Sequence, residues 1–538
     1  MVQSKKATAT KATVTPPHIV QNGMKELYCI SFIEGGVVMV TEIAGARILT
    51  PFFGASLYSW AATLSITLLA LMAGYYFGGY ATTKPKFSSR SAIIWIFLLS
   101  GIMVLLMPYI GYTIMKITIS FSFFSGLIIS ELFFLFPPIF LMGMISPMII
   151  HQITKEASLS GRSAGNIYAI STCGGILFTL IFGFLIIPEY GITVPLRILG
   201  LAVAVLALAL LVKRRLARST VYAVVGFMLI VSVVSFGRNK SDIFPLAPNT
   251  TLLDRSEGLL GELEVTERQV HAPDGTPFYA RQLTTGNILQ DYVVSDSLTF
   301  SLMYYVNFTD QLMKYIPKKS STLLVGLGTG SLYAVLKNQQ ANVETVEIDK
   351  RIYDYGVKYF GMQDHPNHAI TDGRYFLNVT DKKYDLILLD VIIGENVPGQ
   401  LISLEAFQRC KQLLNEGGTL VIEHGAVHNF TDNSFIPSVV KTLNEAGFQV
   451  SIFNPLKSTA YGDVLLVASK KKFETDNKYI SSNILLKGGS LSEYELPITA
   501  FDSESANILT DDINNSDILL KSHYFLVRER VREGLAAR

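Results

Sequence analysis

The chain has 538 residues, of which 16% are charged, with a mean hydropathy of +0.36 and a net charge of +2. This length allows two or three domains, and so low a charged fraction excludes an ordinary soluble protein over the whole chain. The small net charge gives no sign of a nucleic-acid partner, and the three widely separated cysteines form neither a disulfide framework nor a zinc knuckle.

Composition divides the chain into segments. The first 24 residues are rich in Lys, Thr and Ala without an apolar stretch, which is typical of a disordered tail rather than a signal peptide. Apolar runs follow, and the remainder has the composition of a globular protein. We expect a disordered tail at 1–24, a transmembrane helical domain at 25–237, a linker and β-rich cap at 238–315, an α/β domain at 316–475 and a C-terminal segment at 476–538.

The apolar part contains seven or eight runs of about 20 residues, the length that one helix needs to cross a hydrocarbon core about 30 Å thick. The stretch 113–151 is too long for one helix, and Pro137-Pro138 near its middle predicts a break. Lys116 and several hydroxyl side chains make the first of its two pieces a weaker candidate for a membrane span, so the number of spans stays open. The predicted spans are 27–50, 56–80, 91–111, 114–133, 134–152, 166–187, 193–212 and 219–237.

Several residues in the apolar part are unusual for a simple anchor. Glu34, Glu42 and Arg47 lie in the first predicted span, and Glu131 lies in the fourth. Ionisable groups at such depth face a partner or a wet cavity; for Glu42 and Arg47, pairing near a helix end is the simpler expectation. The glycine-containing strings 74–79 and 174–175 predict surfaces of close helix packing.

The globular half begins with short strand-like runs over 258–315, which predict a small β-rich cap. An alternation of strands and helices follows and predicts a doubly wound, largely parallel, Rossmann-like sheet. Ligands of such sheets bind beyond the carboxyl ends of the strands. The expected strands are Thr322–Val325, Asn342–Ile348, Tyr384–Leu389 and Thr419–Glu423.

The turn after the first of these strands is rich in glycine. Gly326, Gly328 and Gly330 remove side chains where backbone can approach a nucleoside. Glu347 follows about 20 residues later, at the end of the second strand, where a carboxylate can accept hydrogen bonds from both ribose hydroxyls. Ser331 stands where a dinucleotide-binding motif has its third glycine. The pattern therefore favours an adenosine ligand over a dinucleotide.

Two further acids follow strand-like pieces. Asp372-Gly373 is placed where a carboxylate can bind an adenine amino group, and Asp390 ends the strand Leu386–Leu389. Each acid alone is most simply a helix cap or a solvated loop residue. Because the carboxyl ends of parallel strands meet at one edge of a sheet, we expect them in a common crevice.

These motifs, in this order, resemble those of spermidine synthases. The resemblance is carried by Gly326–Gly330, Val346–Asp349, Thr371–Arg374 and Tyr384–Asp390, and Gln290 resembles the cofactor-contacting glutamine of that family. Leu509–Asp512 looks like a tail motif of membrane-fused members. Glu42–Gly54, Gly74–Tyr80, Gly161–Gly165 and Tyr168 look like their membrane half, which is also similar to the N-terminal part of major-facilitator transporters.

The resemblance implies a Rossmann-like domain of the class I methyltransferase type and an aminopropyltransferase whose donor is decarboxylated S-adenosylmethionine. An uncharged amine would attack the aminopropyl carbon next to the sulfonium and release methylthioadenosine. Since amine pKa values are about 10, a carboxylate must accept a proton at neutral pH. Asp390 matches the catalytic aspartate of the family; Gly326, Gly328, Thr329, Gly330, Glu347, Asp372 and Gly373, together with Gln290, would bind the cofactor. No metal is needed, because the sulfonium already activates the donor.

Three departures from the family fall at the acceptor end. Thr329 replaces an aspartate of the glycine loop, Ile393 replaces a second acid after the catalytic one, and 300–302 replace a Tyr-His-Glu cluster. Each charge-assisted contact is worth about 1.5–3 kcal/mol, so we expect weak binding of putrescine. Glu395 and either Tyr304 or Tyr305 are candidates to replace the missing groups.

Three interpretations follow from these motifs. The first is an aminopropyltransferase whose acceptor is a different amine or a lipid headgroup. The second is a transferase, such as a methyltransferase, that uses intact S-adenosylmethionine at the membrane. The third is a transporter or sensor whose globular half only binds a nucleoside or polyamine. The resemblance also implies a homo-oligomer.

Basic residues predict the orientation in the membrane. Lys25, Lys84, Lys86 and Arg90 indicate a cytoplasmic N-terminus. Eight crossings then place the globular half in the cytoplasm but leave the basic residues 213–215 outside, whereas seven do the reverse. We favour the even count, because adenosyl cofactors are made in the cytosol. This predicts a multi-pass protein of the plasma (inner) membrane with a cytoplasmic globular half.

Overall fold

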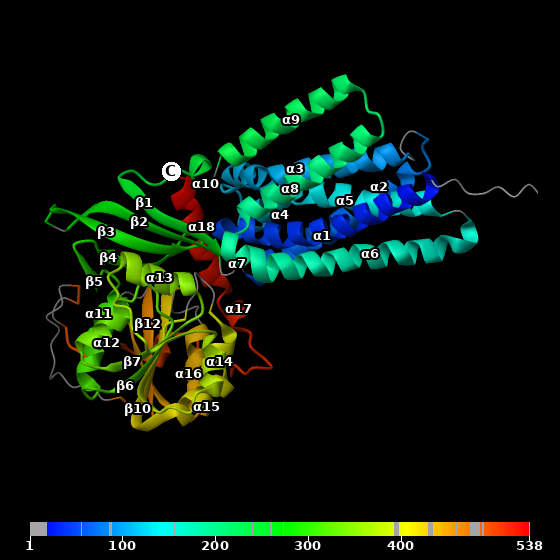
Figure 1. Ribbon diagram of the computed structural model, residues 1–538. Helices are drawn as coiled ribbons and strands as arrows, with labels where there is room; N and C mark the ends of the chain where they lie inside the picture. The colour runs from blue at the N-terminus through cyan, green and yellow to red at the C-terminus, as the bar shows by residue number, and fades with distance from the viewer. Residues whose placement is uncertain are drawn as a thin grey trace, which may run out of the picture.

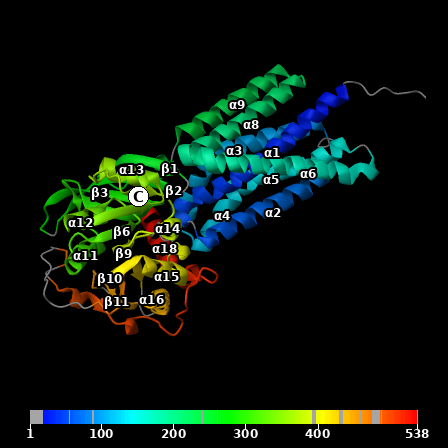
Figure 2. The same cartoon turned by 60° about the horizontal axis from the view of Figure 1, so that its bottom comes forward.

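A bundle of long helices forms one end of the molecule and an α/β domain the other, with an antiparallel sheet and the C-terminal helix between them (Figures 1 and 2). The predicted tail at 1–24 lies mostly outside the described residues. The computed structural model describes residues 19–536 apart from 55, 86–88, 155, 239, 259–260, 273, 392–396, 429–433, 458–460, 474–484 and 487–488.

Among the residues that the structure describes, the bundle has seven helical segments long and apolar enough to cross a membrane. Their outward side chains are apolar; Leu68 and Val233, for example, are 65% and 72% exposed. An exposed apolar surface of this kind is typical of contact with lipid. The helices are α1 (Ile19–Phe53), α2 (Leu57–Ala81), α3 (Arg90–Thr118), α4 (Phe123–Phe134), α5 (Phe136–Ile153), α6 (Ser160–Ile181), α7 (Ile187–Tyr190), α8 (Thr193–Lys213) and α9 (Arg218–Gly237).

The predicted span 114–133 is not a separate crossing. Helix α3 continues to Thr118, and the chain reverses over 119–122 before the short helix α4. Leu135 keeps helical dihedral angles (φ −93°, ψ −45°), so α4 leads directly into α5. Pro137-Pro138 stands at the start of α5, where proline is tolerated because the first-turn amides have no partner within the helix. The described residues therefore form seven segments long and apolar enough to cross a membrane, and the preference for eight was wrong.

Small and polar residues hold the bundle together. A Cβ added to Gly74 would lie 2.5 Å from the Phe140 carbonyl oxygen, and one at Gly174 would lie 1.8 Å from that of Phe32, so the predicted close helix packing is confirmed. The buried Glu34 carboxylate accepts hydrogen bonds from Ser146 and Ser171 on neighbouring helices. These contacts agree with the rule that intramembrane carboxylates find polar partners.

The β-rich cap is a five-stranded antiparallel sheet with the strand order β1-β2-β3-β4-β5. Its inner face packs Leu263, Val265 and Leu283 against Tyr355 and Phe360 of the α/β domain. The strands are β1 (Thr250–Gly258), β2 (Gly261–His271), β3 (Pro277–Thr285), β4 (Ile288–Val294) and β5 (Ser297–Ser301), and α10 (Lys240–Ile243) links the cap to the bundle.

The main sheet has eight strands in the order β13-β11-β12-β10-β9-β6-β7-β8. Strands β10, β9, β6, β7 and β8 are mutually parallel, and β12 is antiparallel to both of its neighbours, β10 and β11. The predicted Rossmann-like fold is confirmed. The strands are β6 (Ser321–Val325), β7 (Asn342–Glu347), β8 (His368–Ile370), β9 (Tyr384–Leu389), β10 (Leu414–His428), β11 (Gln449–Phe453), β12 (Tyr461–Ser469) and β13 (Glu495–Leu496).

Helices cover both faces of this sheet. Alternate side chains of β6 enter two different cores: Leu323 and Val325 join one, and Leu324 joins the other. This alternation is the period-two pattern of a strand buried on both faces. Helices α14 (Gly373–Val379), α15 (Leu404–Leu413) and α16 (Phe435–Glu445) contribute to the first core, and α11 (Tyr304–Leu312), α12 (Ser331–Asn338) and α13 (Lys350–Tyr359) to the second.

The C-terminal helix α18 (Lys521–Ala536), which follows the short α17 (Ser516–Leu519), joins the two halves (Figure 1). The Tyr524 hydroxyl donates to the Phe53 carbonyl oxygen at 2.5 Å, and Arg532 Nε donates to that of Ile119 at 2.8 Å. Arg528 donates to carbonyl oxygens of both the bundle and the cap. The position of the bundle relative to the α/β domain is thus set by hydrogen bonds to helix ends.

Candidate active site

A cavity of about 350 Å³ lies beyond the carboxyl ends of β6, β7 and β9. This is the place where doubly wound sheets bind their ligands. Side chains of α18, among them Val527 and Arg530, form part of its wall. Of the residues predicted for the site, the cavity is lined by Gln290, Tyr305, Gly326, Gly328, Glu347, Asp372, Gly373 and Asp390.

The glycine loop follows β6 and leads into α12. Gly326 has φ +88°, and a Cβ there would lie 1.7 Å from the Asp390 carbonyl oxygen, so only glycine fits. Gly330 has φ +87° and begins α12, and a Cβ there would lie 2.7 Å from the sulfur of Met362. The loop can therefore bring bare backbone to a ligand, as its glycines predict. Gly330 itself is not among the residues that line the cavity.

Glu347 ends β7 and is only 6% exposed. Its carboxylate accepts hydrogen bonds from the backbone N–H groups of Leu327 at 3.1 Å and of Asp349 at 2.8 Å. Burial raises the pKa of Glu347 to about 7, although these hydrogen bonds oppose the rise. A carboxylate fixed against the glycine loop at the rim of a cavity is placed to accept hydrogen bonds from a ligand's hydroxyl groups.

Asp372 lies at the next strand end and caps helix α14. Its Oδ1 accepts a hydrogen bond from the Tyr375 backbone N–H at 2.9 Å. Asp372 and Gly373 nevertheless line the same cavity as Glu347. The capping role and a ligand-binding role are therefore compatible, since a carboxylate has two oxygens and about four acceptor sites.

Asp390, at the end of β9, belongs to a cluster of acids. Asp390 shares a hydrogen bond with the buried Glu423 of β10. The Tyr305 hydroxyl donates to Asp390 Oδ2 at 3.4 Å. Burial raises the pKa of Asp390 to about 7, and the charges of Asp291 and Asp463 add to the rise. Burial beside Asp390 also raises the pKa of Glu423. Two carboxyl groups joined by a hydrogen bond must hold a proton between them.

Thr329 does not line the cavity, which departs from its predicted contact with the cofactor. It is 1% exposed, and its hydroxyl donates to Asp291 Oδ2 and lies 2.8 Å from Ser331 Oγ. Asp291 also accepts a hydrogen bond from the Ser301 hydroxyl at 2.8 Å. A carboxylate thus sits behind the glycine loop after all, but it comes from β4 of the cap instead of from the loop.

Only some of the remaining predicted residues line the cavity. Gln290 lines the cavity, and its amide nitrogen donates to the Ile288 carbonyl oxygen at 3.4 Å. Tyr305, but not Tyr304, reaches the cavity, because Tyr304 packs against the core around α11 and α12. Ile393 and Glu395 lie outside the described residues.

Three acids near the site escaped the sequence reasoning: Asp291, Glu423 and Asp463. Glu423 ends a strand that was expected, so the strand-end rule applied to Asp390 could have found it. Asp463 stands near the start of β12 and lines the cavity. Because β12 runs antiparallel to β10, its beginning lies at the edge where β10 ends. Only the topology shows that relation.

Within the part of the chain that the structure describes, no group of three or more His, Cys, Asp or Glu side chains is arranged to hold a metal ion. The expectation of metal-free chemistry stays a prediction.

The fold and the site define a class: a Rossmann-like α/β domain with a cavity of about 350 Å³ lined by acids at the strand ends. Residues 308–479 match the model of the spermine/spermidine synthase domain. This segment is therefore similar to a spermine/spermidine synthase domain, and the predicted resemblance is confirmed for the motifs within it, from Gly326 to Asp390. The likeness of the bundle to transporters stays a prediction.

Individual relatives cover only parts of the chain. The polyamine aminopropyltransferase of Vibrio vulnificus is 33% identical over 124 residues, which are 22% of this chain and 42% of the relative. That of Serratia proteamaculans is 27% identical over 175 residues, or 29% of this chain and 59% of the relative. The chain thus spans less than two thirds of the length of these relatives. A probable spermidine synthase from Corynebacterium glutamicum is 16% identical, with a TM-score of 0.38, and covers 50% of this chain and 99% of its own.

Proposed function

We propose that the C-terminal half transfers the aminopropyl group of decarboxylated S-adenosylmethionine to an amine. The main observation that supports this proposal is the hydrogen-bonded pair Asp390 and Glu423, which lies in the cavity that Glu347 and Asp372 also line. The adenosine half of the donor would lie against the glycine loop, with Glu347 accepting from the ribose hydroxyls and Asp372 from the adenine amino group. We further propose that the helical bundle spans a lipid bilayer.

In this reaction Asp390 accepts a proton from the attacking amine. The amine nitrogen forms a bond to the aminopropyl carbon, the bond between that carbon and the sulfonium sulfur breaks, and both of its electrons stay on sulfur in neutral methylthioadenosine. A base works best when its pKa lies near the operating pH, and that of Asp390 is about 7. Glu423, the more firmly protonated partner, would hold Asp390 in place by donating a hydrogen bond.

The acids around the site favour the decarboxylated donor over intact S-adenosylmethionine. The intact compound ends in a carboxylate, and the decarboxylated one does not. Asp291 lies directly behind the glycine loop and Asp463 lines the cavity. Repulsion between two like charges about 6 Å apart is about 3 kcal/mol at an effective dielectric constant of 20. A second positive charge on the donor would instead be stabilised by these carboxylates.

The acceptor in this proposal is a diamine or polyamine. Asp463 places a carboxylate in the same cavity as Asp390, where it can bind an ammonium group remote from the attacking nitrogen. A charge-assisted hydrogen bond of this kind contributes about 1.5–3 kcal/mol. The replaced residues Phe300 to Leu302 would change the shape of the acceptor pocket, so putrescine is not expected to be the best acceptor. The primary amine of a lipid headgroup is the competing acceptor.

The test uses the purified full-length protein in lipid nanodiscs. It is incubated with decarboxylated or intact S-adenosylmethionine and, in turn, putrescine, cadaverine, spermidine or phosphatidylethanolamine, and the sulfur product is identified by mass spectrometry. Methylthioadenosine formed with a soluble amine supports the proposal. S-adenosylhomocysteine would identify a methyltransferase, and binding of the donor without turnover would identify a sensor or transporter. Asp390→Asn should lower turnover by at least about a hundredfold, whereas Asp381→Asn, at a fully exposed carboxylate, is the matched control.

Asp463→Asn tests the acceptor. The KM for a diamine should rise by about tenfold or more, whereas the KM for a monoamine of equal length should change little, because only the diamine has a remote ammonium group. Equal effects on both acceptors would contradict the assigned role of Asp463.

A further inference from the structure

The two ends of the helical bundle differ in what they contact. We call the end next to the cap and α18 the domain face, and the opposite end the far face. The start of α1 lies on the far face, since Glu26 forms ion pairs with Lys213 at 2.6 Å and with Arg214 at 3.2 Å, where α8 ends. Figure 1 shows these helix ends away from the α/β domain.

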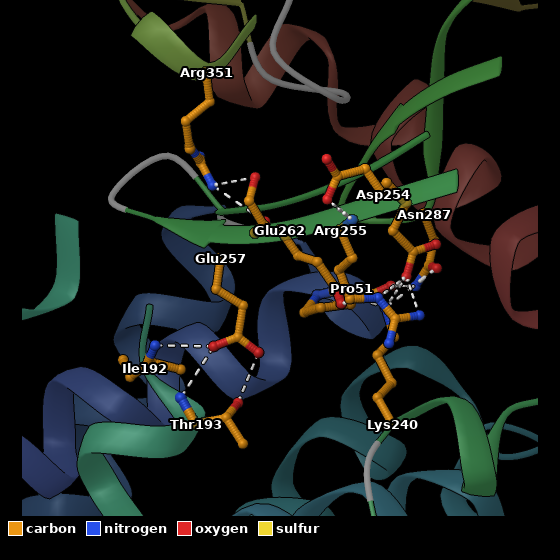
Figure 3. A network of polar contacts seen from close by, with 12 residues as sticks. Pro51, Ile192, Thr193, Lys240, Asp254, Arg255, Glu257, Glu262, Asn287 and Arg351 are labelled. Carbon is orange, nitrogen blue, oxygen red and sulfur yellow. Dashed lines mark hydrogen bonds and ion pairs between the residues drawn. The ribbon is translucent and has the colours of Figure 1, made fainter. Parts of the chain in front are cut away.

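Three connections between helices of the bundle lie on the domain face: the one that follows Phe53, 119–122 and 191–192. The first two adjoin Phe53 and Ile119, which accept hydrogen bonds from α18. At the third, Glu257 of β1 accepts hydrogen bonds from the backbone N–H groups of Ile192 at 2.9 Å and of Thr193 at 3.0 Å (Figure 3). Glu257 thereby caps the start of α8, where a negative charge is favoured by the helix dipole.

Figure 3 also shows Asn287 of the cap, whose side chain donates to the Pro51 carbonyl oxygen at 2.7 Å. Lys240 lies nearby and forms an ion pair with Glu262 of β2. The α/β domain and its cap are thus held against one end of the bundle, and each of the seven long helical segments runs between that end and the far face (Figures 1 and 2).

Basic residues are divided unequally between the two faces. The three connections on the domain face contain no Lys or Arg, whereas the segment that leads from α9 into the cap contains Arg238 and Lys240. On the far face, every connection or its adjoining helix end carries them: Lys84, Arg90, Arg162, Lys213, Arg214 and Arg215. Connections rich in Lys and Arg stay on the cytoplasmic side of a membrane.

Basic residues near the domain face have partners. Lys116 Nζ donates to the Ile243 carbonyl oxygen at 2.8 Å, and Arg197 Nη2 donates to that of Arg238 at 2.9 Å. These two side chains are bound to the chain that leads into the cap. They lie within helices, as do Arg90, Arg162 and Lys213 on the far face, so the far face keeps the larger share of the Lys and Arg residues in connections and helix ends.

We propose that the far face lies in the cytoplasm and that the adenosyl-binding domain lies on the opposite side of the membrane. Seven crossings place the N-terminus and the domain on different sides of the membrane. The basic connections of the far face indicate that this face is the cytoplasmic one. This reverses the orientation expected from an even number of spans. The cavity would then draw its donor and acceptor from outside the cytoplasm. The proposal rests on the proposed span of the bilayer, on the helix count and on the charge distribution, and it is independent of the proposed reaction.

Cysteine labelling of the full-length protein tests this orientation. The exposed native cysteines are replaced (Cys29→Ser and Cys173→Ser), and the buried Cys410 is kept. Two exposed serines then receive single thiols: Ser158→Cys between α5 and α6 on the far face, and Ser505→Cys on the α/β domain. Bacterial spheroplasts are treated with a membrane-impermeant maleimide before and after lysis.

We expect Ser505→Cys to react in intact spheroplasts and Ser158→Cys to react only after lysis. The opposite pattern would overturn the proposal, and so would labelling of both sites only after lysis. A C-terminal alkaline phosphatase fusion gives an independent reading, since this reporter is active only outside the cytoplasm; an inactive fusion in correctly inserted protein would count against the orientation. A failed turnover assay would leave the labelling result unaffected.

Discussion

Asp390 and Glu423 form one hydrogen-bonded pair but should respond differently to amide substitution. Asn cannot accept a proton from the attacking amine, so Asp390→Asn removes the base. Loss of a general base lowers a rate by about 10²–10⁴, which is about 2.7–5.4 kcal/mol at 1.36 kcal/mol per tenfold change. Gln at 423 can still donate a hydrogen bond to Asp390, as the protonated Glu423 does, so the rate should fall by less than about tenfold.

The pH dependence sharpens this comparison. Burial raises the pKa of Asp390 to about 7, so the base is protonated and inactive at pH 5 and ionised at pH 8. The value of kcat/KM should therefore rise with pH, with a midpoint near that pKa, in the wild-type protein and in Glu423→Gln. Glu423→Ala removes the hydrogen bond that lowers the pKa of Asp390, so its midpoint should shift upward.

The assay measures methylthioadenosine release over pH 5 to 9 under single-turnover conditions, so that product release does not limit the rate. Circular dichroism of each variant checks folding. If Glu423→Gln lost as much activity as Asp390→Asn, the assignment of Asp390 as base and Glu423 as hydrogen-bond donor would be refuted. The same holds if the midpoint in Glu423→Ala moved downward.

Three further effects of substitution concern stability and donor binding. Asp390→Asn should raise the free energy of unfolding at pH 8 by at most about 4 kcal/mol and have little effect on it at pH 4. The reason is that a carboxyl whose pKa rises on folding destabilises the folded state as pH rises from about 4 through about 7. Chemical denaturation at both pH values measures the difference. Gly326→Ala should weaken binding of the donor at least tenfold, because φ at Gly326 is +88° and the new Cβ would meet the Asp390 carbonyl oxygen. Calorimetry measures this affinity. An unchanged affinity would contradict the close approach of the glycine loop to the Asp390 backbone. Thr329→Val should lower the free energy of unfolding by about 1–3 kcal/mol, because the buried Asp291 loses a hydrogen-bond donor. Thr329→Ser keeps the hydroxyl and should be nearly neutral. Equal losses in the two variants would show that packing, and not the hydroxyl, matters.

Much of the adenosyl side of the site could be predicted because it depends on local sequence. A buried strand followed by glycines predicts a turn into a helix, and an acid after a parallel strand lies at the common edge of the sheet. Gly326, Glu347, Asp372 and Asp390 therefore meet in one cavity, although they are scattered over 65 residues of sequence. The bundle was equally visible, since crossing a bilayer requires long apolar runs.

The acceptor side and the orientation depended on tertiary structure. Asp463 reaches the cavity only because β12 is antiparallel to its neighbours, and Asp291 stands behind the glycine loop only because the cap folds over it. Hydropathy marks apolar length but does not show that α3 absorbs the first residues of a predicted span or that α4 continues into α5 at Leu135. Sequence patterns specify what each segment can form, whereas contacts between distant segments decide which groups share a site and on which side of the bundle a domain lies.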